Sequence, residues 1–170
     1  MYTDSNEGRQ YLMKKMVSKV NFLYTYDGNR KGAKYTIDGV HYMNGGDFAE
    51  IADKSVRGLD ANKDANTPYD AGSDIPELNT SVKSSKFTLT SCVLGSSFDE
   101  VVNRYFETVH STSWDYVVII DDEVIIYTMN AVEFRSFLNE FASYANDRKV
   151  VRGKATSGKM IAWFEERVEG

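Results

Sequence analysis

Apolar residues recur at helical spacing in five segments of the chain, and this pattern predicts five amphipathic helices. In residues 46–59, Phe48 and Ile51 share one face, while Asp47 and Glu50 stand three residues apart at the start, as in a capping box. The predicted helices are residues 9–24, 46–59, 97–110, 132–145 and 159–168.

Four other segments predict strands, because their apolar residues either alternate with polar ones or follow one another without a break. Residues 80–91 are of the first kind, with Val82 and Leu89 among the apolar members. Residues 114–120 (WDYVVII) and 123–129 (EVIIYTM) are of the second kind and are apolar enough for central strands. The predicted strands are residues 73–78, 80–91, 114–120 and 123–129.

The order of these elements is helices, a strand pair, a helix, a second strand pair and helices. It predicts the α/β class, with a central mixed β-sheet flanked by helices. Segments 26–39 and 60–73 are rich in Gly, Asn and Asp and predict loops. A chain of 170 residues with 42% hydrophobic content can bury one compact core. We therefore expect one domain over residues 1–170, with its core at about 45–145 and basic helical segments at both ends.

Composition excludes several classes of protein. The single cysteine, Cys92, cannot form an internal disulfide, and His41 and His110 lack the cysteine partners of a zinc finger. No stretch approaches the roughly 18 consecutive apolar residues of a membrane-spanning helix. The polar start MYTDSNEGRQ also lacks the charged-then-apolar order of a secretory signal. We expect a cytoplasmic protein with no membrane partner.

The net charge of −5 seems unfavourable for a nucleic-acid partner, but the distribution of charge is uneven. Residues 9–34 hold seven basic residues and one acid, Asp27, and residues 148–159 hold five basic residues and no acid. Charge alone favours an ordinary solvated surface. The basic residues of these two segments could nevertheless contact a phosphate backbone.

The segment 72–86, GSDIPELNTSVKSSK, carries the candidate chemistry. Phosphodiester hydrolysis uses a divalent cation that polarises the phosphate and activates a water, and a hard cation binds oxygen ligands. Asp74 can supply a carboxylate, and Lys83 can position the water and offset negative charge on the phosphate. Ser81 and Lys83 share one face of the predicted strand, and the Val82 carbonyl remains available to the metal.

These residues resemble the motif of the PD-(D/E)xK nuclease superfamily, in which an Asp at the start of one strand is followed on the next by an acid, any residue and a lysine. Asp74 and the triplet Ser81, Val82 and Lys83 reproduce the spacing of its compact members. The resemblance covers roughly residues 45–130. It implies a restriction-endonuclease-like core.

Serine stands at position 81, where that superfamily usually has an acid, so the resemblance implies that a carboxylate comes from elsewhere. Glu50, Glu77 and Glu100 are the candidates. Glu50 lies in the helix before the hairpin, where the superfamily often carries a metal-associated Glu. Glu50 and Glu100 can equally be halves of capping boxes. Asp74 can be a turn residue, and Ser81 can bond a metal-bound water or only satisfy the strand edge.

The resemblance implies a Mg²⁺-dependent endonuclease that hydrolyses double-stranded DNA. Among such enzymes we expect a site-specific type II restriction endonuclease acting as a homodimer, since two strands must be cut and each subunit holds one site. Asp74, with Glu50 or Glu77 and the Val82 carbonyl, would hold the metal. Base and backbone contacts are expected from two groups of residues. They are Asn62, Lys63, Asn66 and Lys86, and Arg148, Lys149, Arg152, Lys154 and Lys159.

Two alternatives remain open. A DNA-junction resolvase or mobile-element nuclease would use the same residues on a branched substrate. A non-catalytic DNA-binding or interaction protein would keep the fold of a nuclease after losing the acid replaced by Ser81.

Overall fold

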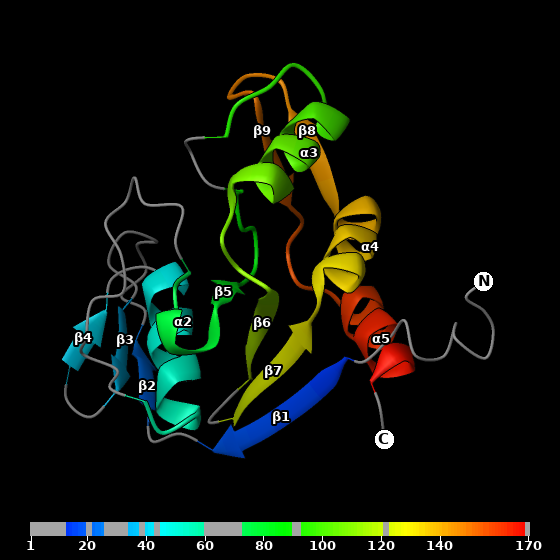
Figure 1. Ribbon diagram of the computed structural model, residues 1–170. Coiled ribbons are helices and arrows are strands. Elements are labelled where there is room, and N and C mark those ends of the chain that lie inside the picture. Colours follow the sequence, from blue (N-terminus) through cyan, green and yellow to red (C-terminus); the bar gives the residue numbers. More distant parts are fainter. Residues whose placement is uncertain are drawn as a thin grey trace.

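The computed structural model in Figure 1 describes most of the second half of the chain and parts of the first. The described residues are 13–19, 22–25, 34–37, 40–42, 45–59, 73–89, 93–120 and 123–168. The helices are α2 (Gly45–Val56), α3 (Phe98–Thr108), α4 (Ala131–Phe141), α5 (Gly158–Arg167) and the 3-10 turn η2 (Pro76–Leu78). The strands are β1 (Lys14–Lys19), β2 (Phe22–Thr25), β3 (Lys34–Ile37), β4 (Val40–Tyr42), β5 (Thr80–Lys83), β6 (Ser113–Ile120), β7 (Glu123–Met129), β8 (Ala142–Ala145) and β9 (Val150–Gly153).

A four-stranded mixed sheet in the order β1-β7-β6-β5 forms the centre of the fold. β6 and β7 are antiparallel neighbours, β1 runs antiparallel to β7, and β5 runs parallel to β6. In Figure 1, α2 lies on one side of this sheet and α4 and α5 lie on the other. The α/β class with a central mixed sheet flanked by helices, which the order of elements predicted, is confirmed.

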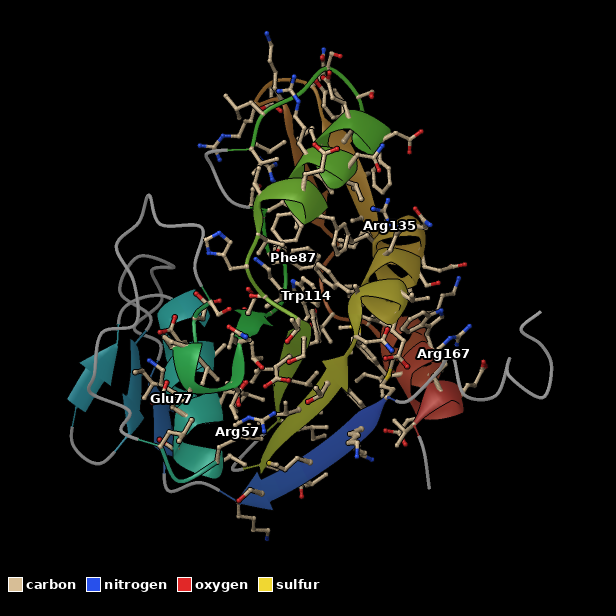
Figure 2. All side chains as sticks on the ribbon, viewed as in Figure 1. Arg57, Glu77, Phe87, Trp114, Arg135 and Arg167 are labelled. Carbon is tan, nitrogen blue, oxygen red and sulfur yellow. The ribbon has the colours of Figure 1, made fainter. Side chains whose placement is uncertain are left out.

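One face of the sheet packs on a large aromatic core beneath α3, α4 and α5. Alternate residues of β6, including Trp114 and Tyr116, point to this face because side chains of a strand alternate between its two sides. They meet Phe134 and Phe137 of α4 and Phe164 of α5, all fully buried. Figure 2 shows Trp114 in this region, in the space below α3 and beside α4. We call this the aromatic face.

The opposite face is covered by α2 and packs on smaller side chains. Ala49 and Ala52 of α2 lie against Val117, Val124 and Ile126 of β6 and β7. A second sheet, in the order β2-β3-β4, lies on the other side of α2 (Figure 1). We call the surface of the central sheet beneath this helix the α2 face.

Side chains cap three helices at their first turns. Ser97 accepts a hydrogen bond from the Glu100 amide at the start of α3, and Ser157 does the same for Met160 in α5. Asn130 and Glu133 form a complete capping box at α4. Each cap satisfies an amide that has no partner within its helix. The predicted helices that begin near 46, 97 and 159 are confirmed as α2, α3 and α5.

The predicted basic helix over residues 9–24 is wrong where the structure describes it. Residues 14–19 form β1, which pairs with β7 from Lys14↔Thr128 to Lys19↔Glu123, and residues 22–25 form β2. Met13 and Met16, two of the apolar residues at helical spacing that suggested a helix, do not share a buried face, because Met13 is fully buried and Met16 is 36% exposed. The segment forms a strand because pairing with β7 satisfies the backbone hydrogen-bonding groups along one edge of β7. The local sequence gives no signal of this pairing.

The predicted helix over 132–145 is partly wrong, because α4 ends at Phe141 and residues 142–145 form β8. β8 pairs antiparallel with β9 through a tight turn, in which Lys149 has a φ of 58°. The segment 34–42, part of which we predicted to be loop, contains the hairpin of β3 and β4. None of the described helices is long and apolar enough to cross a bilayer.

Candidate active site

A tight turn, and not the predicted strand over residues 73–78, connects Asp74 to β5. Ile75 and Thr80 exchange both backbone hydrogen bonds, at 2.9 and 3.2 Å, and the 3-10 turn η2 fills the space between them. Asn79 closes the turn with a φ of 51°, a left-handed conformation that asparagine tolerates. Only the single bridge Ile75↔Thr80 is strand-like. Pro76 is the first residue of η2, where its fixed φ suits the start of a helical turn and its missing amide is not needed.

The turn brings the Asp74 carboxylate to the outer edge of β5. Asp74 Oδ2 accepts a hydrogen bond from the Val82 amide at 2.7 Å. The backbone groups of Thr80 point away from β6 toward Ile75, and those of Val82, two residues later, point the same way. The Val82 carbonyl therefore faces the edge at which Asp74 lies.

Ser81 is buried and belongs to a chain of three hydroxyl groups. Its Oγ lies within hydrogen-bond distance of Ser111 Oγ, at 2.5 Å, and Ser111 Oγ lies 2.7 Å from Ser73 Oγ. Ser73 and Ser111 are also buried. The Ser81 side chain thus bonds to Ser111, which bonds in turn to Ser73, and Ser81 is only 5% exposed.

Lys83 points to the aromatic face together with Ser81. Its Nζ lies 5.6 Å from the centroid of the Tyr105 ring in α3, within the range of a cation–π interaction. The Tyr105 hydroxyl accepts a hydrogen bond from Trp114 Nε1 at 2.8 Å, so the ring is held in place. In the part of the chain that the structure describes, no acid forms an ion pair with Lys83.

The three candidate glutamates lie in different places. Glu50 pairs with Lys54 at 3.2 Å within α2, which covers the face opposite to Ser81 and Lys83. Glu77 is exposed in η2, close in sequence to Asp74. Glu100 accepts hydrogen bonds from the Ser96 amide and hydroxyl, and these bonds lower the pKa of its carboxyl group. The Ser97 hydroxyl caps α3, but the Glu100 carboxylate bonds to Ser96 and not to the Ser97 amide, so the predicted capping box is only half formed.

No group of three or more Asp, Glu, His or Cys side chains comes close enough to hold a metal ion within the described ranges. Asp74 and the Val82 carbonyl remain the oxygen atoms that the structure brings to one edge. The acid that would replace Ser81 is not identified among the described residues.

Several predicted DNA-contacting residues from two distant segments come together beyond β5. The Lys86 amide donates to the Lys154 carbonyl at 3.2 Å, and Thr88 bridges to Arg152 in β9. Lys86 and Lys154 are exposed, and Arg152 is partly exposed. Arg148 and Lys149 lie in the β8–β9 turn, and Lys159 lies in the first turn of α5. Asn62, Lys63 and Asn66 lie outside the described residues.

A buried ionic cluster on the α2 face was not predicted. Arg57, just after α2, donates to Asp53 Oδ1 and to Asp115 Oδ2 of β6, both at 2.7 Å. The Thr128 hydroxyl on β7 donates to Asp115 Oδ1 at 2.6 Å. Figure 2 shows Arg57 between α2 and the sheet. A single acid inside the apolar run WDYVVII was the signal that could have drawn attention to Asp115.

The two acids of this cluster differ in their surroundings. Asp53 and Asp115 are both fully buried, but Asp53 Oδ2 has no hydrogen-bond partner among the described residues. Burial, reinforced by the neighbouring Asp115 carboxylate and opposed by Arg57, raises the pKa of Asp53 to about 9. Burial therefore favours the neutral form of Asp53 in this cluster.

Comparisons with protein-family models, with curated proteins and with solved structures found no match to this chain. The interpretation of the site therefore rests on its residues and their geometry.

Proposed function

We propose that this protein is a metal-dependent endonuclease that hydrolyses phosphodiester bonds of double-stranded DNA. One observation carries the proposal. The Asp74 carboxylate is fixed on the Val82 amide at 2.7 Å, at the edge to which the Val82 carbonyl also points, and Lys83 follows directly in the same strand. An acid, a carbonyl and a lysine on one short segment are the groups that this reaction requires.

The residues present fit a hard divalent cation such as Mg²⁺. Asp74 Oδ2 is engaged by an amide, which leaves the carboxylate oxygen Oδ1, and the Val82 carbonyl adds a neutral oxygen as a second ligand. Mg²⁺ is commonly held by one or two carboxylates and keeps several waters, so a small protein ligand set is compatible with it. When bound, the cation would polarise the phosphate and lower the pKa of a water.

Lys83 and the basic residues beyond β5 have separate roles in this proposal. Lys83 would leave the Tyr105 ring to offset negative charge on the phosphate, and a cation–π contact is weak enough to allow that movement. Lys86, Arg152 and Lys154 would contact the backbone of DNA, because they lie on two adjoining segments and are at least partly exposed, and such cations can follow a row of phosphates.

The proposal is tested by incubating the protein with plasmid DNA and Mg²⁺. Asp74→Asn keeps an oxygen that can accept from the Val82 amide but removes the charge, so cutting should fall by about a hundredfold or more while the fold persists. Lys83→Ala should reduce cutting to a similar extent. Glu140 is an exposed acid on α4, so Glu140→Gln should cut as the parent does. An active Asp74→Asn variant, or a parent protein that does not cut with Mg²⁺ or Mn²⁺, would refute the proposal.

The substrate and assembly are part of the same proposal. Digestion of a mapped genome should give fragment ends that share a sequence, as for a type II restriction enzyme acting as a homodimer. Ends that share a branched structure instead would favour the resolvase. Sedimentation of the active protein on DNA would show whether two copies act together.

A non-catalytic DNA-binding protein is the second candidate. The observation in its favour is that no three potential metal-binding side chains gather within the described residues. Binding of DNA by the parent protein with no cleavage under any divalent cation would support it.

A further inference from the structure

Ser111, in the connection between α3 and β6, joins the two segments that carry the candidate site. Its Oγ lies 2.7 Å from Ser73 Oγ and at hydrogen-bond distance from Ser81 Oγ. Ser73 immediately precedes Asp74, and Ser81 immediately precedes Val82. One hydroxyl therefore connects the residues next to both groups of the candidate metal site.

The backbone of the same connection holds the turn between these segments. The amides of Thr112 and Ser113 both donate to the Asn79 carbonyl, at 2.9 and 3.3 Å. The Ser113 hydroxyl lies 2.6 Å from the Thr80 hydroxyl on the neighbouring strand. These backbone bonds and the Ile75–Thr80 pair fix the turn, and the Ser111 side chain adds a link from Ser73, beside Asp74, to Ser81, beside Val82.

Burial makes this link sensitive to the loss of one hydroxyl. Ser73, Ser81 and Ser111 are all less than a tenth exposed, so water cannot freely replace a missing partner. Removing the Ser111 hydroxyl would break its bonds to Ser73 and Ser81, and the residue before Asp74 would lose this side-chain link to β5. The Asp74 segment would then be held to β5 by the Ile75–Thr80 backbone bonds and by the hydrogen bond from the Val82 amide.

We propose that Ser111 is a positioning residue that sets the separation between the Asp74 carboxylate and the Val82 carbonyl through its bonds to Ser73 and Ser81. Its effect on catalysis rests on the proposed endonuclease function, but its effect on the geometry does not. Side chains that orient ligands of a metal typically change its affinity or the activity by about 10–100-fold when they are removed.

The test compares Ser111→Ala with Thr112→Ala, an exposed neighbour in the same connection. The Mg²⁺ concentration for half-maximal cleavage should rise about tenfold in Ser111→Ala, with the affinity for DNA without Mg²⁺ unchanged. Ser111→Thr, which retains the hydroxyl, should recover much of the loss. Thr112→Ala should behave as the parent. Equal Mg²⁺ dependence of Ser111→Ala and the parent would overturn the inference while the endonuclease function stood.

A second measurement does not depend on activity. In NMR spectra, the Val82 amide signal of Ser111→Ala should shift and its hydrogen exchange should accelerate, because its bond to Asp74 loosens. Amides of β6 and β7 should exchange as in the parent, which separates a local change from general destabilisation. If the parent does not cut DNA, only the endonuclease proposal fails. If the Val82 amide is unaffected, the positioning role fails whatever the activity.

Discussion

The two faces of the central sheet are built from different interactions. On the aromatic face, rings from β6, α4 and α5 stack on one another, as in Trp114 with Phe134 at 5.2 Å and Tyr127 with Phe164 at 4.3 Å between centroids. On the α2 face, small apolar residues surround an ionic cluster of Arg57 with two buried acids. The first face gains stability from area and packing, and the second requires one particular pairing.

This difference teaches where stability and orientation come from. Aromatic rings contribute through buried area and tolerate several arrangements, so they hold α4 and α5 strongly without fixing them by one contact. A buried ion pair adds little net stability, because desolvation offsets its attraction, but losing one partner is costly. Arg57 thereby ties the end of α2 to the centre of β6. We infer that the ionic cluster sets the position of α2 and that the rings set the stability.

The largest loss of stability is expected from a substitution on the aromatic face. Phe137 contacts six rings, including Tyr116 at 5.3 Å and Phe164 at 5.2 Å. Phe137→Ala should lower the free energy of unfolding by about 3–5 kcal/mol, because it removes buried area and leaves a cavity. Chemical denaturation measures this change. Phe137→Leu, which refills part of the space, should cost much less, and an equal cost would contradict the cavity argument.

The next effect concerns the α2 face. Asp115→Ala should cost about 3 kcal/mol, the lower end for breaking a buried pair, because the Arg57 side chain is 18% exposed and can regain some water. Denaturant melts would measure it. The double variant with Arg57→Leu should recover part of the loss. A double variant less stable than the sum of both single changes would contradict an electrostatic origin.

A smaller effect tests the tightness of the aromatic core. A Cβ on Gly153 would overlap the Phe87 ring, which is packed against Phe137. Gly153→Ala should therefore cost about 2 kcal/mol, as overpacked cores do. Gly158→Ala is the matched control, since its Cβ would meet nothing within 4 Å. The melting temperature should fall in Gly153→Ala and should stay the same or rise slightly in Gly158→Ala, because alanine at an open helical position is mildly stabilising.

The smallest change in stability is expected from Asp53→Asn, which distinguishes the two acids of the cluster. The variant should change the free energy of unfolding by less than about 1 kcal/mol near pH 4, where Asp53 is neutral in the folded protein and has only begun to ionise in the unfolded chain. Asp115→Asn should cost more, since it weakens the 2.7 Å ion pair between Asp115 and Arg57. Equal costs at that pH, measured by denaturation, would show that the two acids share their charge.

The same variant has a pH dependence of known sign. The folded protein keeps the proton of Asp53 up to a pKa of about 9, whereas an ordinary Asp releases it near 3.8. The parent protein therefore loses stability from this group as the pH rises between these values. Asp53→Asn lacks that loss, so it should gain stability relative to the parent between pH 6 and 9. A constant difference in melting temperature across this range would contradict the raised pKa.

Much of the fold was predictable because its patterns are local. The apolar runs of β6 and β7, and the amphipathic helices α2, α3 and α5, carry their own signals. β1 was mistaken for a helix because its Lys and Met residues suit either structure, and only the edge of β7 decided between them. β8 was missed for the same reason, since its partner β9 comes later in the chain.

The candidate site was predictable only in part. Spacing placed Asp74, Ser81 and Lys83 in one segment, and the structure shows that the Asp74 carboxylate lies beside Val82. Spacing did not indicate that Ser81 is buried against Ser111 or that Lys83 rests on Tyr105, because both partners lie in later elements. Glu50 was a reasonable candidate by order of elements, but the sheet separates its helix from the face of Lys83.

The sequence by itself determined which segments become helices or central strands, because hydrophobic periodicity and helix caps act over only a few residues. The tertiary structure decided which strands pair, which face each side chain joins and which buried polar groups meet. Arg57 with Asp115, and Ser111 with Ser73 and Ser81, are contacts between residues 30 to 58 positions apart. Such contacts form only once the whole core excludes water, since a buried polar group without a partner is costly.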